Sequence, residues 1–455
     1  QWEISTNGTV FNNIGGATNQ NYQPPALTAT RYYRRVVTSE PCSDISNVVR
    51  ISVNPLPQGS LTANGPFCVS GTGQLRWTAT TGGSGPYTIV YNDGTANRTR
   101  TNVTSGTWFN VAVNPVTSTT TYTLVSVTHE TTTCSRTSGF TTGSATITIN
   151  PLPQGSLSAN GPFCGSGAGR LTWTATSGTG PYTIVYNDGT ANRTASNVTS
   201  GTPFNVSPGT VSSTTTYTLV SVTDNTTTCV RNSGFTGPSA TITVNPLPQG
   251  SLSANGPFCA TGTGRLTWTA TTGTGPYTII YNDGTANRTA NNVVSGTPFN
   301  VFANPVTSTT TYTLVSVTDN STTCTRTSGF TTGSATITVN PLPQGSLSAN
   351  GPFCATGTGQ LTWTATAGTG PFRIVYNDGT ANRTVNNVVS GTSFNVYTTP
   401  VTSTTTYTLV SVRDNSTTCT RTSGFTTGSA TITIHPLPVP SLSGQVSVCI
   451  GPPGY

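Results

Sequence analysis

A recurring stretch of fifteen residues constrains the fold of this chain more than any other feature. It reads NPLPQGSL followed by SANGPFC or TANGPFC, and its copies occupy 54–68, 150–164, 245–259 and 340–354, with a partial copy, HPLPVPSL, at 435–442. Successive copies begin 96, 95, 95 and 95 residues apart. Solenoid coils repeat roughly every 20–50 residues, whereas about 95 residues can bury a core of their own. The spacing therefore predicts a tandem array of small domains.

The repeat spacing divides the chain into six segments. Four complete repeats are predicted, which we call repeat 1 (55–150), repeat 2 (151–245), repeat 3 (246–340) and repeat 4 (341–435). Residues 1–54 are expected to be the C-terminal part of a preceding domain, and 436–455 the start of a further repeat. Both ends are thus expected to cut through domains of a longer parent protein.

Within one repeat the apolar residues alternate with polar ones, which is the period of a half-buried β-strand. In the segment RLTWTAT, Leu266, Trp268 and Ala270 alternate with threonines, and an Asn-Asp-Gly sequence that favours tight turns ends at Gly284. Seven strands and no helix are predicted for repeat 3, at 250–255, 265–271, 276–284, 287–294, 297–302, 309–317 and 334–339.

Seven short strands rich in Thr, Val, Ile and Tyr fit an all-β, immunoglobulin-like β-sandwich. Tyr312 stands at the start of the sixth strand, where such folds often place a corner tyrosine, but Trp268 lies on the second strand and not on the third. The Pro-Leu-Pro sequence between repeats favours a stiff, extended connection. The array is therefore predicted to form an elongated rod.

The composition argues against several classes of function. Only 6% of the residues are charged, all 18 basic residues are Arg, and a net charge of +7 is spread over 455 residues, so the clustered cations of a nucleic-acid surface are not expected. His129 and His435 are the only histidines and do not recur in phase, so we expect no catalytic site, no cofactor and no enzyme activity. No apolar run is long enough to span a bilayer, and without Lys no Lys–Asn isopeptide bond can form.

Carboxylates recur at two places in each repeat, in the turn (Asp93, Asp188, Asp283, Asp378) and after the sixth strand (Asp224, Asp319, Asp414, with Glu130 near that place in repeat 1). Two acids per domain are too few for a hard-cation cage, so we interpret them as turn formers and expect no metal site. A weak Ca²⁺ site at a domain junction is the alternative. The phased tyrosines, at positions 91, 186, 281 and 376, are interpreted as core residues, with stacking on sugar rings as the alternative.

Ten cysteines occur at two fixed places per repeat, without C-x-x-C pairs or neighbouring His, which favours disulfides over zinc and an extracellular location. In a seven-stranded sandwich the loop after the first strand lies at the C-terminal end of a domain, and the loop after the sixth strand at its N-terminal end. This placement predicts bonds between neighbouring repeats, Cys68–Cys229, Cys164–Cys324 and Cys259–Cys419, leaving Cys42, Cys134, Cys354 and Cys449 for domains outside this sequence. The alternative is intradomain pairing, Cys68–Cys134, Cys164–Cys229, Cys259–Cys324 and Cys354–Cys419, and a third option joins Cys134 to Cys164.

Three stretches carry a family resemblance: GGSGPYTIVYNDG at 82–94, TYTLVSVTDN at 216–225 with the following Cys229, and PPALTATRYYRRVV at 24–37. They resemble the repeats of the very large, type IX-secreted cell-surface adhesins of gliding Bacteroidota, the SprB type. The resemblance covers the whole chain. It implies an extended surface filament that contacts a polysaccharide or substratum and that depends on secretion and motility machinery.

Two functional hypotheses follow. The first is a structural stalk of a cell-surface adhesin, whose repeats supply reach and stiffness for attachment and gliding motility and whose partners are neighbouring domains of the same chain. The second is a multivalent array in which each repeat binds a glycan weakly and avidity supplies the affinity.

Overall fold

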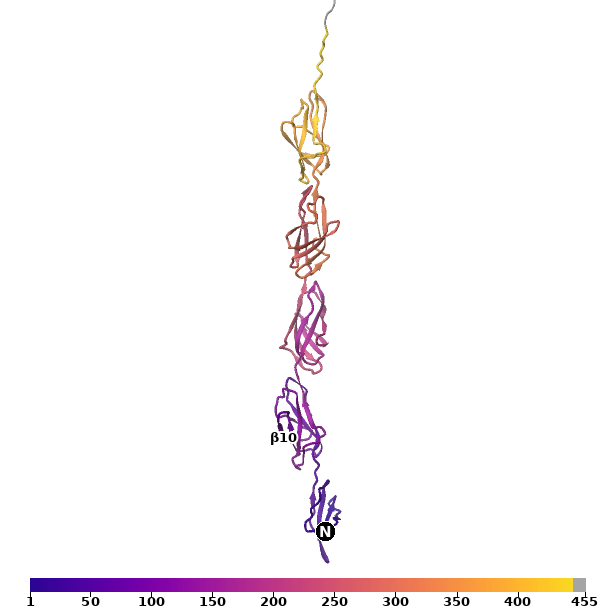
Figure 1. The fold of residues 1–455 in the computed structure, drawn as a ribbon, viewed down its shortest axis with the longest axis vertical. Coiled ribbons are helices and arrows are strands. Elements are labelled where there is room, and N and C mark those ends of the chain that lie inside the picture. Colours follow the sequence, from indigo (N-terminus) through magenta and orange to yellow (C-terminus); the bar gives the residue numbers. More distant parts are fainter. Residues whose placement is uncertain (445–455) are drawn as a thin grey trace, which may run out of the picture. The chain divides into compact units, whose positions relative to one another are not determined.

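The computed structural model describes residues 1–444, and within them the chain forms strands, turns and loops without any helix. No segment of this described part is therefore a helix of the length and hydropathy needed to cross a membrane. Figure 1 shows the strands of the successive repeats, coloured along the sequence. The all-β prediction is confirmed.

Repeat 3 shows the architecture of a complete repeat. One sheet has three strands in the order β26 (Gln249–Ala254), β28 (Arg265–Thr272) and β31 (Pro298–Asn300). The other has the order β30 (Asn287–Val293), β29 (Tyr277–Asn282), β32 (Thr310–Asp319) and β33 (Thr325–Arg326), with β34 (Ser334–Ile337) also paired to β32. Both sheets are antiparallel and face each other across one core. This is an immunoglobulin-like β-sandwich, as predicted.

The last predicted strand of the repeat is divided in two. Residues 334–339 were expected to form one strand, but β34 ends at Ile337 and β35 (Val339–Asn340) pairs in parallel with the short β27 (Phe258–Cys259). The side-chain hydroxyl of Thr309 accepts the N–H of Val339 at 3.0 Å, which replaces a ladder bond at the break. The end of the repeat is therefore attached to the loop that carries its first cysteine.

The other repeats follow the same plan. The strands of repeat 1 are β6 (Gln58–Ala63), β7 (Phe67–Cys68), β8 (Gln74–Thr81), β9 (Tyr87–Asn92), β10 (Asn97–Val103), β11 (Trp108–Asn110), β12 (Thr120–His129), β13 (Ser135–Arg136), β14 (Ser144–Ile147) and β15 (Ile149–Asn150). Those of repeat 2 are β16 (Gln154–Ala159), β17 (Phe163–Cys164), β18 (Gly167–Ser177), β19 (Tyr182–Asn187), β20 (Asn192–Val198), β21 (Pro203–Val211), β22 (Thr215–Asp224), β23 (Val230–Arg231), β24 (Ser239–Ile242) and β25 (Val244–Asn245). Those of repeat 4 are β36 (Gln344–Ala349), β37 (Phe353–Cys354), β38 (Gln360–Ala367), β39 (Phe372–Asn377), β40 (Asn382–Val388), β41 (Ser393–Asn395), β42 (Thr405–Asp414), β43 (Thr420–Arg421), β44 (Ser429–Ile432) and β45 (Ile434–His435).

The N-terminal segment forms a smaller set of strands. They are β1 (Trp2–Ser5), β2 (Asn12–Asn13), β3 (Arg31–Ser39), β4 (Cys42–Ile45) and β5 (Val49–Ile51), and β3 pairs with β1, β4 and β5. This central strand with a partner on each edge matches the place of β12 in repeat 1, which pairs with β9, β13 and β14.

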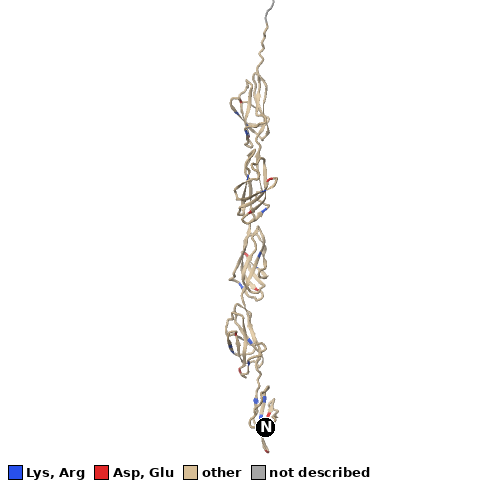
Figure 2. Ribbon diagram, in the orientation of Figure 1, with Lys and Arg blue, Asp and Glu red and all other residues tan. Residues whose placement is uncertain are grey.

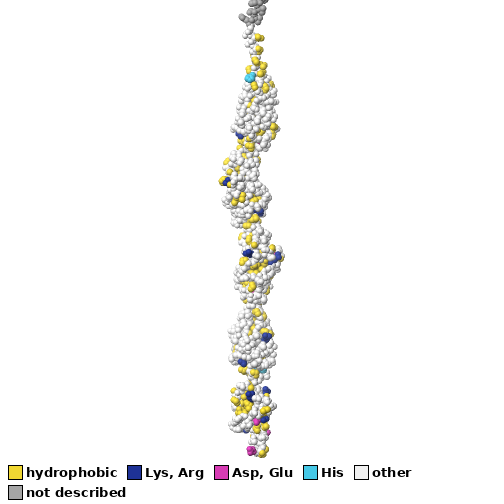
Figure 3. Space-filling view, turned by 90° about the vertical axis from the view of Figure 1, so that its right-hand side faces the viewer, with side chains coloured by type: hydrophobic (Ala, Val, Ile, Leu, Met, Phe, Trp, Pro, Cys, Tyr) yellow, Lys and Arg dark blue, Asp and Glu magenta, His cyan; other side chains and the backbone are white. Residues whose placement is uncertain are grey.

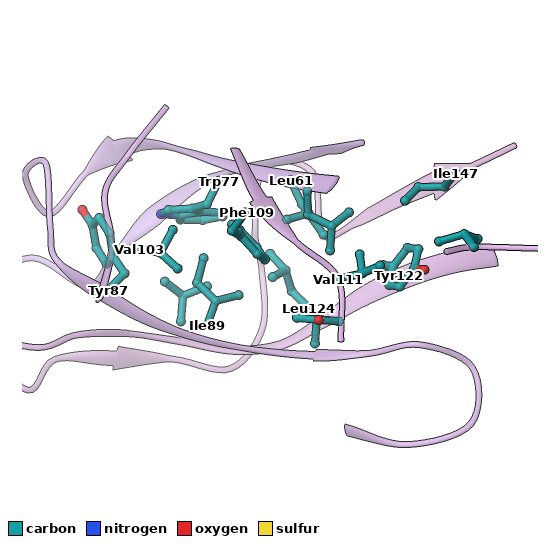
Figure 4. Close-up of a cluster of buried hydrophobic side chains, with 14 residues drawn as sticks. Leu61, Trp77, Tyr87, Ile89, Val103, Phe109, Val111, Tyr122, Leu124 and Ile147 are labelled. Carbon is teal, nitrogen blue, oxygen red and sulfur yellow. The ribbon is translucent and has the colours of Figure 1, made fainter. Parts of the chain in front are cut away.

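The core of each sandwich is built around a tryptophan. Trp268 is fully buried and meets the rings of Tyr277 and Phe330 edge to face, with centroids 6.3 and 6.0 Å apart. Figure 4 shows the equivalent cluster in repeat 1, where Trp77 and Tyr87 lie between the two sheets. Edge-to-face contacts of this kind add to the stability gained from burying the rings. The alternation that predicted the strands therefore also identifies the core-facing side.

The described residues divide into two compact units. The first unit contains residues 1–162 and 166–243, and the second contains 163–165 and the described residues from 244 onward. Repeat 1 lies within the first unit, and repeats 3 and 4 lie within the second. Residues 163–165 of repeat 2, which include Cys164, group with the second unit, while most of that repeat belongs to the first. The boundaries predicted from the repeat spacing, and the rod shape, remain predictions.

Candidate functional site

The first cysteine of each repeat lies where the chain leaves that repeat. In the second unit, β17 carries Cys164 and pairs in parallel with β25, so that Cys164 stands opposite Asn245. The N–H of Gly165 donates to the carbonyl of Asn245 at 2.8 Å. Pro246, the first residue of the Pro-Leu-Pro sequence, follows directly. A short ladder therefore holds Cys164 beside the exit of the repeat.

The second cysteine of repeats 2, 3 and 4 is presented by a loop that a buried aspartate organises. The carboxylate of Asp319 accepts the backbone N–H groups of Thr274 and Ser321 at 2.7 and 3.0 Å. The N–H of Asp319 in turn donates to the carbonyl of Cys324 at 2.9 Å. Asp319 and Cys324 are both fully buried. The carboxylate thus fixes the loop that leads to the cysteine, which agrees with its interpretation as a turn former.

Three disulfides form within residues 1–444: Cys68–Cys229, Cys164–Cys324 and Cys259–Cys419, with Cα–Cα distances of 5.6, 5.4 and 5.5 Å. Each bond lies within one of the two units. Each joins the first cysteine of one predicted repeat to the second cysteine of the next. The structure does not form the intradomain pairs or the Cys134–Cys164 pair. The distances fall in the range that a disulfide requires.

The remaining described cysteines are unpaired, and two of them, Cys134 and Cys354, share the local backbone of the bonded ones. Ala355 follows Cys354 and has a φ of +65°, close to the +64° of Ala260 after the bonded Cys259. Thr133 precedes Cys134 with a φ of +55°. A left-handed backbone at a residue other than Gly is uncommon. Cys42 is exposed and unpaired, Cys449 lies outside the described residues, and the partners predicted for all four beyond this sequence remain a prediction.

Four phased arginines anchor the Pro-Leu-Pro sequence, a role that the sequence analysis missed. Each follows a second cysteine by two positions and donates from Nε to the carbonyl of the second proline at 2.7 Å, in the pairs Arg136–Pro57, Arg231–Pro153, Arg326–Pro248 and Arg421–Pro343. The hydroxyl of Thr272 also donates to the carbonyl of Leu247 at 2.7 Å. Figure 2 shows the arginines of the chain as blue segments scattered along the ribbon. The fixed C-x-R spacing was the available signal.

A second set of phased arginines pairs with the turn carboxylates. Arg288 Nε lies 2.7 Å from Asp283 Oδ2, and the other Asp283 oxygen accepts the N–H groups of Thr285 and Ala286. The hydroxyl of Thr285, the guanidinium of Arg288 and these N–H groups hold the pKa of Asp283 well below its usual range. The same pair recurs as Asp93–Arg98, Asp188–Arg193 and Asp378–Arg383. The turn-forming interpretation of these aspartates is confirmed.

The phased tyrosines are core residues. Tyr91, Tyr186, Tyr281 and Tyr376 are at most 2% exposed. The hydroxyl of Tyr281 accepts the N–H of Phe302 at 3.0 Å, and the same bond recurs in the other repeats. The core interpretation is confirmed, and sugar stacking on these four rings is ruled out by their burial.

The histidines and carboxylates do not gather into a metal-binding group. Among residues 1–444, no three His, Cys, Asp or Glu side chains come close enough to hold an ion. His129 occupies the place in repeat 1 that Asp319 has in repeat 3, and its ring meets Tyr87 edge to face with centroids 5.2 Å apart. His435 pairs with Cys354 in the β37–β45 ladder.

Asp414 gives a pH-dependent prediction for repeat 4. Burial opposes ionisation, yet the backbone N–H of Thr369 and the N–H and hydroxyl of Ser416 lower the pKa of Asp414 to about 2. Because the folded pKa lies below the unfolded value of roughly 3.9, the stabilisation of about 2 kcal/mol is present above pH 4 and is lost as pH falls through 2. Asp414→Asn is expected to destabilise repeat 4 at pH 6 and to approach the wild type near pH 2, as measured by hydrogen exchange of repeat 4 peptides. A difference that does not change with pH would contradict this.

Comparisons with known proteins identify no family for most of the chain. Residues 1–55 match a family described as a Domain of unknown function (DUF8696). No curated protein matches. Among solved structures, the chain is similar to the chicken CNTN1 FN1-FN3 domains at 14% identity and a TM-score of 0.21, covering 63% of this chain and 98% of that one. It is also similar to Sidekick-1 immunoglobulin domains 1-4 at 9% identity and a TM-score of 0.23, covering 84% and 97%.

Proposed function

We propose that this chain is a segment of an extracellular stalk, part of a cell-surface adhesin, in which disulfides between consecutive repeats transmit tension. Three disulfides indicate an oxidising environment outside the cytoplasm, and arrays of immunoglobulin-like repeats suit a structural or adhesive role. The adhesin assignment, gliding motility and type IX secretion rest on the sequence resemblance. Neighbouring domains of the same protein would be the immediate partners.

The observation that carries the proposal is the position of each disulfide relative to the connection between repeats. In the first unit, Cys68 lies beside Asn150, directly before Pro151, and Cys229 lies two residues from Arg231, which is bonded to Pro153. The Cys68–Cys229 bond therefore runs in parallel with the Pro-Leu-Pro connection. A force applied along the chain is shared between a covalent bond and the backbone, which suits a stalk.

The second candidate is the multivalent glycan-binding array. Its support is a pair of large rings that the structure leaves exposed, Phe302 at 69% and Tyr397 at 70%. Binding to a polysaccharide that increases with the number of repeats, and that is lost when an exposed ring is removed, would favour this candidate over a passive stalk.

Small-angle scattering tests the stalk proposal. A compact chain of this length would have a radius of gyration of about 22 Å. Four sandwiches with strands of about 25–30 Å each, joined end to end, would exceed about 100 Å in length. We expect an elongated monomer with a radius of gyration above about 30 Å, and reduction of the disulfides to broaden the distance distribution. A value near that of the compact chain would refute the stalk.

A further inference from the structure

A small hollow recurs at the same place in every complete repeat. In repeat 3 it has a volume of about 240 Å³ and lies between the Asp-Arg turn and the segment that follows β31. Its lining includes an ion pair, hydroxyls and the exposed ring of Phe302, from Asp283, Thr285, Arg288, Phe302, Ser308 and Thr310. The corresponding hollows of repeats 1, 2 and 4 measure about 160, 200 and 150 Å³. The sequence analysis assigned no role to this place.

An exposed ring accompanies the hollow in repeats 3 and 4: Phe302 lines the hollow of repeat 3, and Tyr397 adjoins that of repeat 4 through Arg383, the partner of the lining Asp378. The guanidinium carbon of Arg288 lies 3.9 Å from the centroid of Phe302, and that of Arg383 lies 3.8 Å from the centroid of Tyr397. The backbone N–H of each ring residue donates to a buried tyrosine hydroxyl at 3.0 Å. The stacked arginine and the backbone hydrogen bond therefore hold each ring in place, while about 70% of the surface of Phe302 and of Tyr397 stays exposed to solvent. Figure 3 shows how sparsely hydrophobic side chains interrupt the polar surface on one face.

The polar side of the hollow presents hydrogen-bond donors, and both oxygens of its carboxylate already accept hydrogen bonds. Both oxygens of Asp283 are occupied, one by Arg288 and the other by the Thr285 hydroxyl and two N–H groups. Arg288 uses Nε for that pair, and its two terminal nitrogens donate to no other group within residues 1–444. A guanidinium with two remaining donors binds a carboxylate in a bidentate manner.

We propose that the hollows of repeats 3 and 4 bind uronate residues of an acidic polysaccharide. The exposed face of Phe302 or Tyr397 stacks on the C–H face of the pyranose ring, the terminal nitrogens of the arginine bind the sugar carboxylate, and the threonine and serine hydroxyls bind ring hydroxyls. Aromatic faces and a few fixed polar groups around a small concavity are the usual elements of such a site. This proposal rests on the glycan-binding candidate given above, whose ligand class it names, and it does not depend on the stalk function.

Repeats 1 and 2 supply an internal comparison. They keep the Asp-Arg pair and the hollow, but Ala112 and Ser207 stand where repeats 3 and 4 have Phe302 and Tyr397. Two of the four complete repeats therefore carry the full site, and both belong to the second unit. The Cys259–Cys419 bond connects these two repeats, which favours simultaneous binding of two sugars on one polymer.

Titration calorimetry on the full oxidised chain with hexagalacturonate tests the proposal, and cellohexaose serves as the neutral probe. We expect two sites per chain for hexagalacturonate, and at least roughly five-fold weaker binding after Phe302→Ala with Tyr397→Ala. Trp108→Ala is the matched control, because Trp108 is also exposed and lies 4.7 Å from Arg76, but its arginine is not the one that pairs with the turn aspartate beside the hollow of repeat 1. Unchanged binding by the double variant, or equal binding of the neutral probe, would overturn the proposal.

Installing the ring in repeat 1 provides an independent test that does not depend on loss of binding. Ala112→Phe is expected to raise the number of hexagalacturonate sites from two to three, because Arg98 and the hollow are already present there. Unchanged stoichiometry in a folded variant with all three disulfides would count against the site. Scattering by the same variants reports on the stalk separately, so failure of one proposal is distinguishable from failure of the other.

Discussion

When the oxidised chain is pulled by its two ends, residues 68–419 are expected to contribute a contour length of only about 100 Å. The covalent path passes from Cys68 to Cys229 through a disulfide, continues along 30 residues (259 − 229), and passes from Cys259 to Cys419 through another disulfide. At about 3.3–3.6 Å per residue, only those 30 residues can extend. The stretches bridged by the two disulfides lie off this covalent path, so they add no contour length whether or not they unfold.

Reduction is expected to release a large additional length. The two disulfides on the path withhold stretches with sequence separations of 161 and 160 residues, which correspond to about 1,100 Å of contour length. Single-molecule force spectroscopy with and without a reductant measures this directly. A chain that extends to the same length in both conditions would show that the bonds do not carry the force.

The overlap of the three bonds supplies a matched control. Cys164→Ser with Cys324→Ser removes a bond that the shortest path does not use, so we expect no change in the oxidised contour length. Cys68→Ser with Cys229→Ser lengthens the shortest path to 161 residues, 96 from Cys68 to Cys164 (164 − 68) and 65 from Cys324 back to Cys259 (324 − 259), a gain of about 450 Å. Equal effects of the two double variants would contradict the proposed force path.

Local patterns were sufficient to predict the sandwich. The alternation around Trp268 and the Asn-Asp-Gly turn depend on neighbouring residues, so period and turn chemistry identify them directly. The break at the end of the repeat could not be predicted in this way, because β34 and β35 select different partners far away in the sequence. The alternation of apolar and polar residues alone predicts a single strand at 334–339.

The arginines show why the site was harder to predict than the fold. Their low density suggested dispersed surface charge, yet Arg326 and Arg288 have specific partners, Pro248 and Asp283. The spacing shows that each arginine recurs at the same position of every repeat. It does not show which carbonyl or carboxylate lies within hydrogen-bonding distance in the folded chain. The exposure of the Phe302 ring was not predicted either, because TPFNVF was interpreted only as a strand.

Trp268→Ala is expected to destabilise repeat 3 by about 3–5 kcal/mol, because the substitution removes a fully buried side chain and leaves a cavity between Tyr277 and Phe330. A domain of this size is stable by only about 5–10 kcal/mol, so much of repeat 3 would open. Hydrogen exchange with mass spectrometry can follow each repeat separately, because peptides such as TPFNVFANPV occur only in repeat 3.

The effect should remain largely within repeat 3, because its buried cluster, like those of repeats 1 and 4, consists of residues of a single repeat. Thr269→Ala is the control, since Thr269 lies next to Trp268 on the exposed face of β28 and its loss should change stability by less than about 0.5 kcal/mol. Loss of protection in all four repeats of Trp268→Ala would mean that the array unfolds as one cooperative unit, and unchanged protection in repeat 3 would mean that the tryptophan does not organise its core. Protection lost in repeat 3 alone would establish each sandwich as a separate folding unit.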